Sequence, residues 1–209
     1  KVELRQILED AENFSRIVLI QNLSHEQILA ITPHLEDMPE LSVEERYIRR
    51  YINGPAQAHV MGYMGRVSSD DLAAYGDFYK NIGYIGKSGL EAQYEEVLRG
   101  DFGIEVREQD SKGSIRKKFI EKAPSPGKSM LLNIDWELQR YAFEVTQKKL
   151  REIGLKKGVF VAIDPRSGGI LALLSLPSFD PNDLVSGISQ KEFDSIFLHK
   201  DKPLFNRVL

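Results

Sequence analysis

The sequence predicts an α+β fold in two parts, and three observations support this prediction. Short amphipathic helices with clear start signals alternate with β-branched segments over residues 1–122. Two prolines and a glycine within residues 123–128 mark a linker. Beyond it, one long helical pattern is followed by two apolar strands joined by a proline- and glycine-containing turn, which predicts an antiparallel sheet with a helix packed on it.

Composition excludes several classes of function. With 42% hydrophobic and 28% charged residues, the 209-residue chain has the balance of a globular protein, long enough for one domain or two small ones. A net charge of −3 lacks the basic surface that nucleic-acid binding needs. The chain has no cysteine, and its four histidines show no metal-ligand spacing. We therefore predict no metal and no cofactor.

The first part is predicted to begin with short elements. Ser24 and Gln27 form a capping box for a helix that Pro33 should shorten. Apolar residues at helical spacing predict helices over residues 3–14, 55–64 and 69–75. β-branched and alternating residues predict strands over 16–21 and 41–51.

A glycine-rich stretch follows, and it carries aromatic side chains. We expect a helix over residues 90–99, closed by Gly100, and a β-hairpin over 103–121 with its turn at 111–113. Exposed aromatic side chains are effective interface anchors, although they can equally pack inside the domain. The predicted partner-binding residues are Tyr75, Phe78, Tyr79, Ile82 and Tyr84.

The second part is predicted to contain a strand, a helix and a hairpin. After a short strand over residues 130–134, Asp135 caps a helix that Gly154 ends. Apolar strands over 158–163 and 169–174 enclose the turn at 164–168. A turn-rich loop over 177–182 and a weak helix over 191–199 complete this part.

Several motifs in a fixed order carry a resemblance to a known family. Residues 86–100, with the pattern Gly-x-x-Gly-Leu-Glu, then Tyr, then Leu-x-Gly, resemble a motif of the pedestal module in class B penicillin-binding proteins of the elongation type. Residues 49–65 resemble an earlier pedestal motif, except that Ile52 stands where proline is usual. Residues 161–172, 177–182 and 206–207 resemble the opening of the transpeptidase domain. The motif residues, predicted to be structural, are Arg50, Gly62, Tyr63, Gly86, Gly89, Leu90, Glu91, Tyr94, Gly100, Asp164, Pro165, Gly168, Asp180, Pro181, Asn182, Asn206 and Arg207.

The resemblance implies a domain division and an activity. It implies a pedestal domain over residues 1–122, a linker over 123–128 and an incomplete transpeptidase domain over 129–209. The parent protein would be a peptidoglycan D,D-transpeptidase that crosslinks stem peptides through a serine acyl-enzyme. The nucleophile of the Ser-x-x-Lys motif is expected beyond Arg207, outside this chain, so no catalytic residue is assigned here.

Two local Ser-x-x-Lys matches lack the helical setting that the chemistry needs. A serine and a lysine three residues apart face each other on a helix, but they point to opposite faces of a strand. Ser114 lies in the predicted hairpin, and Ser125 lies in the predicted linker before a proline. We therefore interpret both matches as chance.

The resemblance also implies partners and a location. These are a membrane glycan polymerase of the shape, elongation, division and sporulation family, a rod-shape scaffold protein, and stem peptides and β-lactams bound through the catalytic region. The protein would lie on the periplasmic side of the inner membrane, anchored by an N-terminal helix absent from this chain. A β-lactam sensor and a purely scaffolding module remain alternative functions, and elongation type versus division type remains open.

Overall fold

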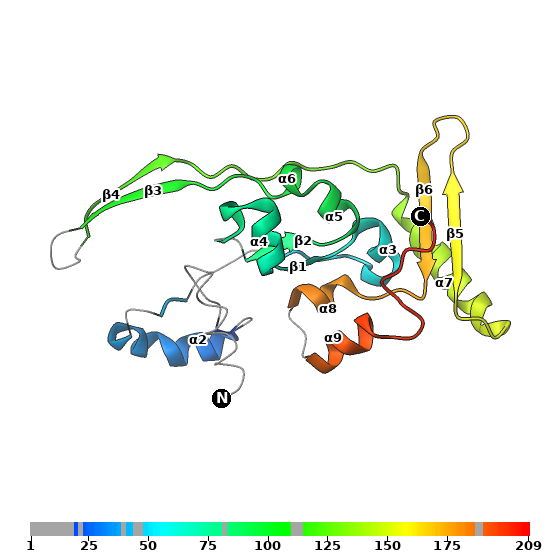
Figure 1. The fold of residues 1–209 in the computed structure, drawn as a ribbon, viewed down its shortest axis with the longest axis horizontal. Helices are drawn as coiled ribbons and strands as arrows, with labels where there is room; N and C mark the ends of the chain where they lie inside the picture. Colours follow the sequence, from blue (N-terminus) through cyan, green and yellow to red (C-terminus); the bar gives the residue numbers. More distant parts are fainter. Residues whose placement is uncertain are drawn as a thin grey trace.

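The computed structural model describes residues 19–20, 23–38, 41–43, 48–80, 83–109, 115–186 and 190–209. Its fold is α+β, with small antiparallel sheets and mostly short helices, as predicted. The molecule is elongated (Figure 1), with the hairpin of strands β3 (Ile104–Gln109) and β4 (Ile115–Lys122) at one end. Helix α7 (Trp136–Glu152) lies at the other end, beside strands β5 (Gly158–Ile163) and β6 (Ile170–Leu176).

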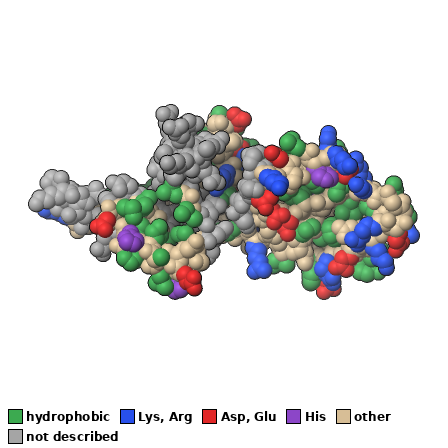
Figure 2. Space-filling model, turned by 90° about the horizontal axis from the view of Figure 1, so that it is seen from below, with side chains coloured by type: hydrophobic (Ala, Val, Ile, Leu, Met, Phe, Trp, Pro, Cys, Tyr) green, Lys and Arg blue, Asp and Glu red, His purple; other side chains and the backbone are tan. Residues whose placement is uncertain are grey.

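Helix α2 (His25–Ile31) confirms the predicted capping box. The Ser24 hydroxyl accepts the Gln27 backbone N–H at 3.2 Å, and the Gln27 side chain accepts the Ser24 N–H at 2.8 Å. The α-helix stops before Pro33 and continues as the 3₁₀-helix η2 (Thr32–Asp37). No residue of α2 is buried, and hydrophobic side chains gather over this helix in the view from below (Figure 2).

Two strand predictions are wrong in the residues that the structure describes. The described residues of 41–51 contain no strand, because the backbone of Tyr51 pairs with a side chain instead of another strand. Residues 130–134 also form no strand. The predicted helix over 3–14 and most of the strand over 16–21 lie outside the described residues.

The centre of the first part has a small aromatic and aliphatic core. Val67, Tyr79 and Ile85 are buried together, and Leu72 and Phe78 pack against them. Strand β1 (Met64–Arg66) pairs antiparallel with β2 (Tyr84–Gly86), which carries Ile85, and Val67 directly follows β1. Helix α4 (Ser69–Tyr75) carries Leu72, and the 3₁₀-helix η3 (Asp77–Lys80) carries Phe78 and Tyr79. Helix α3 (Gly54–Met61) precedes β1.

The helix predicted over residues 90–99 is divided in two. Helix α5 (Gly89–Gln93) and helix α6 (Glu95–Leu98) are separated by Tyr94, whose φ of −116° and ψ of 25° are not helical. Just after this break the carboxylate of Glu95 is buried. It accepts the Gly86 backbone N–H at 2.9 Å and the Tyr79 hydroxyl at 3.4 Å, which joins α6 to the core.

Backbone hydrogen bonds hold the predicted linker against the first part. Asp101 and Ser125 exchange N–H···O bonds of 2.9 and 3.0 Å, and the Lys128 N–H donates to the Val97 carbonyl at 2.8 Å. Residues 123–128 therefore run as a strap along the end of α6. The antiparallel strand pair predicted before this strap is confirmed as β3 and β4, and it projects away from the body (Figure 1). The turn predicted at 111–113 lies outside the described residues.

The second part matches its predicted helix and hairpin. Asp135 caps α7 by accepting the backbone N–H groups of Glu137 and Leu138, both at 3.0 Å. Strands β5 and β6 pair antiparallel. Helices α8 (Pro181–Ser186) and α9 (Gln190–Phe197) follow. In the described part of the chain, no helix is both long enough and apolar enough to cross a lipid bilayer.

A completely buried amide, Gln139, ties both parts together. Its Oε1 accepts the Leu173 backbone N–H at 2.8 Å, and its Nε2 donates to the Leu173 carbonyl at 2.7 Å. The same Nε2 donates to the carbonyl of Ala56 at 2.6 Å. One side chain of α7 thereby satisfies backbone groups of both β6 and α3.

The close approach of α3 to α5 requires glycine at the end of α3. Gly62 has a φ of 77° and a ψ of −153°, a conformation that essentially only glycine adopts. A Cβ on Gly62 would also overlap the backbone carbonyl of Ser88, just before α5. Gly76 has almost the same backbone conformation, with a φ of 80° and a ψ of −171°, but open space around it.

Alanine substitutions at Gly62 and Gly76 distinguish the stability cost of backbone strain from that of steric overlap. We expect Gly76→Ala to lower the free energy of unfolding by about 1–3 kcal/mol through strain alone. Gly62→Ala should cost roughly 1–3 kcal/mol more, because the backbones of α3 and α5 must also move apart. Urea denaturation of both variants measures the difference, and equal losses would refute the close approach.

The buried amide can be tested in the same way. Gln139→Ala leaves the Leu173 N–H and the Ala56 carbonyl without these partners, so it should lower the free energy of unfolding by about 2–4 kcal/mol. Gln147→Ala, at an exposed position of the same helix, is the matched control and should change it by less than about 0.5 kcal/mol. Similar denaturation midpoints for the two variants would contradict the assigned role of Gln139.

Candidate functional site around helix α3

Helix α3 lies where the two parts of the chain meet. It packs against α5 of the first part and against α7, α8 and β6 of the second. We call this region the junction. It comprises residues 49–63, Glu91, Gln139, residues 178–182 and residues 203–207.

The side chain of Asn182 holds the backbone just before α3. Its Oδ1 accepts the Tyr51 N–H and its Nδ2 donates to the Tyr51 carbonyl, both at 2.9 Å. Asp180 orients this amide, because its Oδ1 accepts both the Asn182 backbone N–H at 2.9 Å and the Asn182 Nδ2 at 2.8 Å. A Cβ at Gly54 would overlap that Oδ1 of Asp180, which explains the glycine at the start of α3.

An ion pair between Arg49 and Glu91 also holds the backbone just before Tyr51. Glu91 of α5 is 2% exposed, and its two carboxylate oxygens accept the Nε of Arg49 at 2.8 Å and the Nη2 at 3.2 Å. The predicted motif arginine was Arg50, but Arg50 is exposed and the structure brings Arg49 to Glu91. The spacing Arg-x-Tyr before Tyr51 is the sequence signal that identifies Arg49.

The ring of Tyr51 fills the space between α3 and β1. It is 6% exposed, and its hydroxyl accepts the Met64 backbone N–H at 3.0 Å. Burial raises the pKa of Tyr51, and the negative charge of Glu91 raises it further. The phenol therefore stays neutral at physiological pH and acts as a structural hydrogen-bonding group.

Both ends of α3 bond to the second part of the chain. The Ser178 hydroxyl donates to the Pro55 carbonyl at 2.6 Å, and the ring Nε2 of His59 lies 2.8 Å from the Pro203 carbonyl. The Phe179 ring packs edge-on against the rings of His59 and Tyr63, with centroid distances of 5.6 and 6.0 Å. The predicted motif residue Tyr63 therefore packs against the second part of the chain through Phe179.

His59 is neutral in this environment. Burial lowers the pKa of its imidazole, the hydrogen bond to Pro203 opposes this effect, and the positive charge of Arg207 adds to it. Since a carbonyl oxygen only accepts hydrogen bonds, we assign the Nε2–H tautomer, which donates to Pro203.

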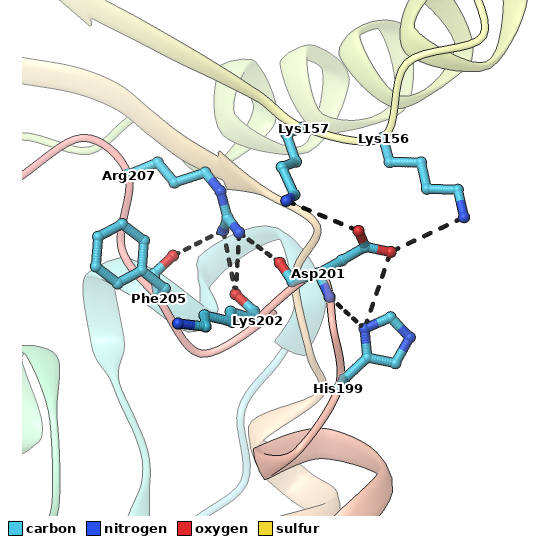
Figure 3. A network of polar contacts seen from close by, with 7 residues as sticks. All are labelled: Lys156, Lys157, His199, Asp201, Lys202, Phe205 and Arg207. Atoms are coloured by element: carbon cyan, nitrogen blue, oxygen red, sulfur yellow. Dashed lines mark hydrogen bonds and ion pairs between the residues drawn. The ribbon is translucent and has the colours of Figure 1, made fainter.

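Arg207 closes the last segment of the chain into a rigid loop (Figure 3). Its guanidinium donates to the carbonyls of Phe205 at 2.9 Å and Lys202 at 3.2 Å, and also to the carbonyl of Asp201. The Asp201 carboxylate lies 3.9 and 3.8 Å from the ammonium groups of Lys156 and Lys157, which precede β5.

Other predicted motif residues lie outside the junction. Asp164, Pro165 and Gly168 form the turn between β5 and β6. The pKa of Asp164 is lowered chiefly by the backbone N–H of Arg166, as expected for a carboxylate that fixes a turn. Gly100 lies under the strap, where a Cβ would overlap the Ser125 carbonyl.

The predicted aromatic anchors divide into exposed and buried residues. Tyr75 is 62% exposed, whereas Phe78 and Tyr84 are half-buried. Tyr79 is 1% exposed, so its prediction as an exposed anchor is wrong. Its ring completes the core, and its hydroxyl accepts a hydrogen bond from the Arg99 guanidinium at 2.5 Å. Ile82 lies outside the described residues.

Sequence reasoning missed Phe102 as a member of this surface. Its ring lies 4.7 Å from that of Phe78, and the Arg99 guanidinium stacks 3.9 Å above the Phe78 ring. Phe102 is 42% exposed. Local periodicity could not predict this contact, because the strap contact at the preceding residue, Asp101, sets the position of Phe102. We call Tyr75, Phe78 and Phe102 the aromatic surface.

The polar side chains of the described residues bond segments that are distant in the sequence. No group of three or more His, Asp or Glu side chains among them could hold a metal ion. The Ser125 hydroxyl donates to the Asp101 carboxylate at 3.2 Å in the exposed strap, and Ser114 lies outside the described residues. The junction is therefore a polar joint between segments that are distant in the sequence.

Comparisons with known proteins agree with this architecture. The chain is 34% identical over 203 residues to the peptidoglycan D,D-transpeptidase MrdA of Acinetobacter baumannii. The aligned region covers 97% of this chain and 29% of that protein. The chain thus spans less than a third of that relative's length.

Solved structures share the fold. A penicillin-binding protein from Helicobacter pylori, solved in complex with MreC, superposes with a TM-score of 0.72 at 23% identity, covering 97% of this chain and 38% of that one. A structure described as a peptidoglycan synthase complex that coordinates polymerization and crosslinking gives a TM-score of 0.67 at 27% identity, covering 99% of this chain and 38% of that one. The penicillin-binding protein dimerisation domain matches residues 1–132, more than half of the sequence, and the chain therefore belongs to that family.

Proposed function

We propose that this chain is the pedestal, with the opening of the transpeptidase domain, of a peptidoglycan D,D-transpeptidase. The observation that carries the proposal is the junction, where the backbone before α3 bonds to Asn182, and α3 itself bonds to Gln139 and Pro203 of the second part. A pedestal must hold its catalytic domain in a fixed orientation, and paired polar side chains provide that directionality. The proposed division is a pedestal over residues 1–122, a linker over 123–128 and a transpeptidase portion from 129 onward.

The proposed reaction is acyl transfer through a serine. In the whole protein, a serine hydroxyl attacks the carbonyl of the D-Ala-D-Ala bond of one stem peptide and expels the terminal D-Ala. The amine of a second stem peptide then displaces the serine from the acyl-enzyme and forms the crosslink. This chain supplies the scaffold for that chemistry, since sheet strands β5 and β6 are fixed to the pedestal through Gln139 and Ser178.

The second proposed role is protein docking through the aromatic surface. Tyr75 exposes a ring that contacts Tyr79, and Phe102 exposes a ring that contacts Phe78, over which Arg99 stacks. Exposed rings held by such packing are typical of interface anchors. A rod-shape scaffold protein is the proposed partner, because a structure of the same fold is solved in complex with MreC. A membrane glycan polymerase is the other proposed partner. The proposed location is the periplasmic face of the inner membrane, held there by an N-terminal anchor.

Labelling with a fluorescent penicillin tests the enzymatic proposal. We expect the complete protein to form a covalent adduct that survives denaturing electrophoresis, and unlabelled ampicillin added first should prevent it. The isolated 209-residue chain should remain unlabelled, because its Ser125 is engaged with Asp101 in the strap. A complete protein without label would refute the proposal, and a labelled isolated chain would refute our interpretation of its serines.

Replacing the exposed rings tests the docking proposal. Tyr75→Ser combined with Phe102→Ser should weaken binding of the complete protein to the soluble domain of its rod-shape scaffold protein by about tenfold or more, measured by biolayer interferometry. Ile52→Ser, at a 73% exposed residue before α3, is the control and should bind like the wild type. Unchanged binding of the double variant would exclude the aromatic surface as the docking site.

A further inference from the structure

We propose that Ser175 and His59 are positioning residues for the catalytic serine of the whole protein. They hold residues 203–207 (the terminal segment) from two sides, and the placement of this segment sets the placement of the residues that come after it in the chain. This inference rests on the proposed function and on the family resemblance, which implies a nucleophile beyond Arg207.

Ser175 attaches the terminal segment to the sheet. It is 2% exposed and lies between Leu174 and Leu176 in an otherwise apolar part of β6. Its hydroxyl donates to the Phe205 carbonyl at 3.2 Å and accepts the Arg207 backbone N–H at 3.1 Å. A buried hydroxyl costs free energy unless it is paired, so these two bonds account for a serine at this position.

His59 attaches the terminal segment to the pedestal. Its Nε2–H donates to the buried Pro203 at 2.8 Å, and the Asn206 Nδ2 lies 3.5 Å from the His59 backbone carbonyl. Phe179 packs edge-on against the imidazole and limits its rotation. The segment is therefore bonded to α3 at both Pro203 and Asn206.

The terminal segment is stiff between these attachments. The Arg207 guanidinium binds the carbonyls of Asp201, Lys202 and Phe205, so the loop keeps its shape (Figure 3). A stiff segment that loses one of its two attachments can pivot about the other. Its end would then move even though the fold around it is intact.

The test measures the second-order rate of acylation of the complete protein by a fluorescent penicillin, per folded molecule, together with the thermal midpoint. Ser175→Ala and His59→Ala should each slow acylation by about 10- to 100-fold, since a displacement near 1 Å has effects of this size. His59→Gln should recover most of the rate, because a glutamine Nε2 can also donate to Pro203. Ser195→Ala, at an exposed serine of α9 whose hydroxyl bonds only locally to Glu192, is the matched control.

The outcomes distinguish this inference from the function on which it rests. A wild-type protein that is not acylated overturns both. A wild type that is acylated, with Ser175→Ala and His59→Ala acylated at the same rate, overturns the inference alone. A lower thermal midpoint with an unchanged rate per folded molecule would assign both residues a purely structural role, and would also overturn it. Because the two substitutions are independent, a failure of one variant to fold leaves the other decisive.

Discussion

The two hydrogen bonds between the Asn182 amide and the backbone of Tyr51 are the constraint on which the rest of the junction depends. They give a non-strand segment the donor and acceptor that a neighbouring strand would otherwise supply. Asp180 orients the amide, and its carboxylate occupies the space that a side chain at residue 54 would need. Tyr51, Gly54, Asp180 and Asn182 thus fit together at the start of α3, and this start fixes where the helix lies.

The junction uses polar side chains where many interdomain contacts use apolar packing. Gln139, Ser178 and His59 each bond to a backbone carbonyl, and each bond has a preferred direction as well as a length. Apolar surfaces can slide over one another with little loss of contact, whereas a buried polar group that loses its partner is penalised. The joint between α3 and the second part therefore fixes one orientation.

Local sequence signals predicted the elements that local physics determines. The capping box at Ser24, helix α7 and the β5–β6 pair are all predictable from periodicity and turn residues within a short window. The errors share a different origin. The backbone of Tyr51 bonds to Asn182, 131 positions away, and Tyr79 is buried by tertiary packing against Val67 and Ile85, so neither outcome is visible in a short sequence window. For the same reason, the contacts of the motif residues and the roles of Gln139 and Ser175 could not be predicted from the sequence, because their partners lie far along the chain.

The long separation between bonded residues has a consequence for biosynthesis. Tyr51 and Asn182 are 131 positions apart, and His59 and Pro203 are 144 apart. At about 5–20 residues per second, the ribosome needs on the order of ten seconds to make the intervening chain. During that interval the Tyr51 backbone and the His59 ring lack these partners, so the first part of the chain cannot complete its fold until residues 182 and 203 have been synthesised.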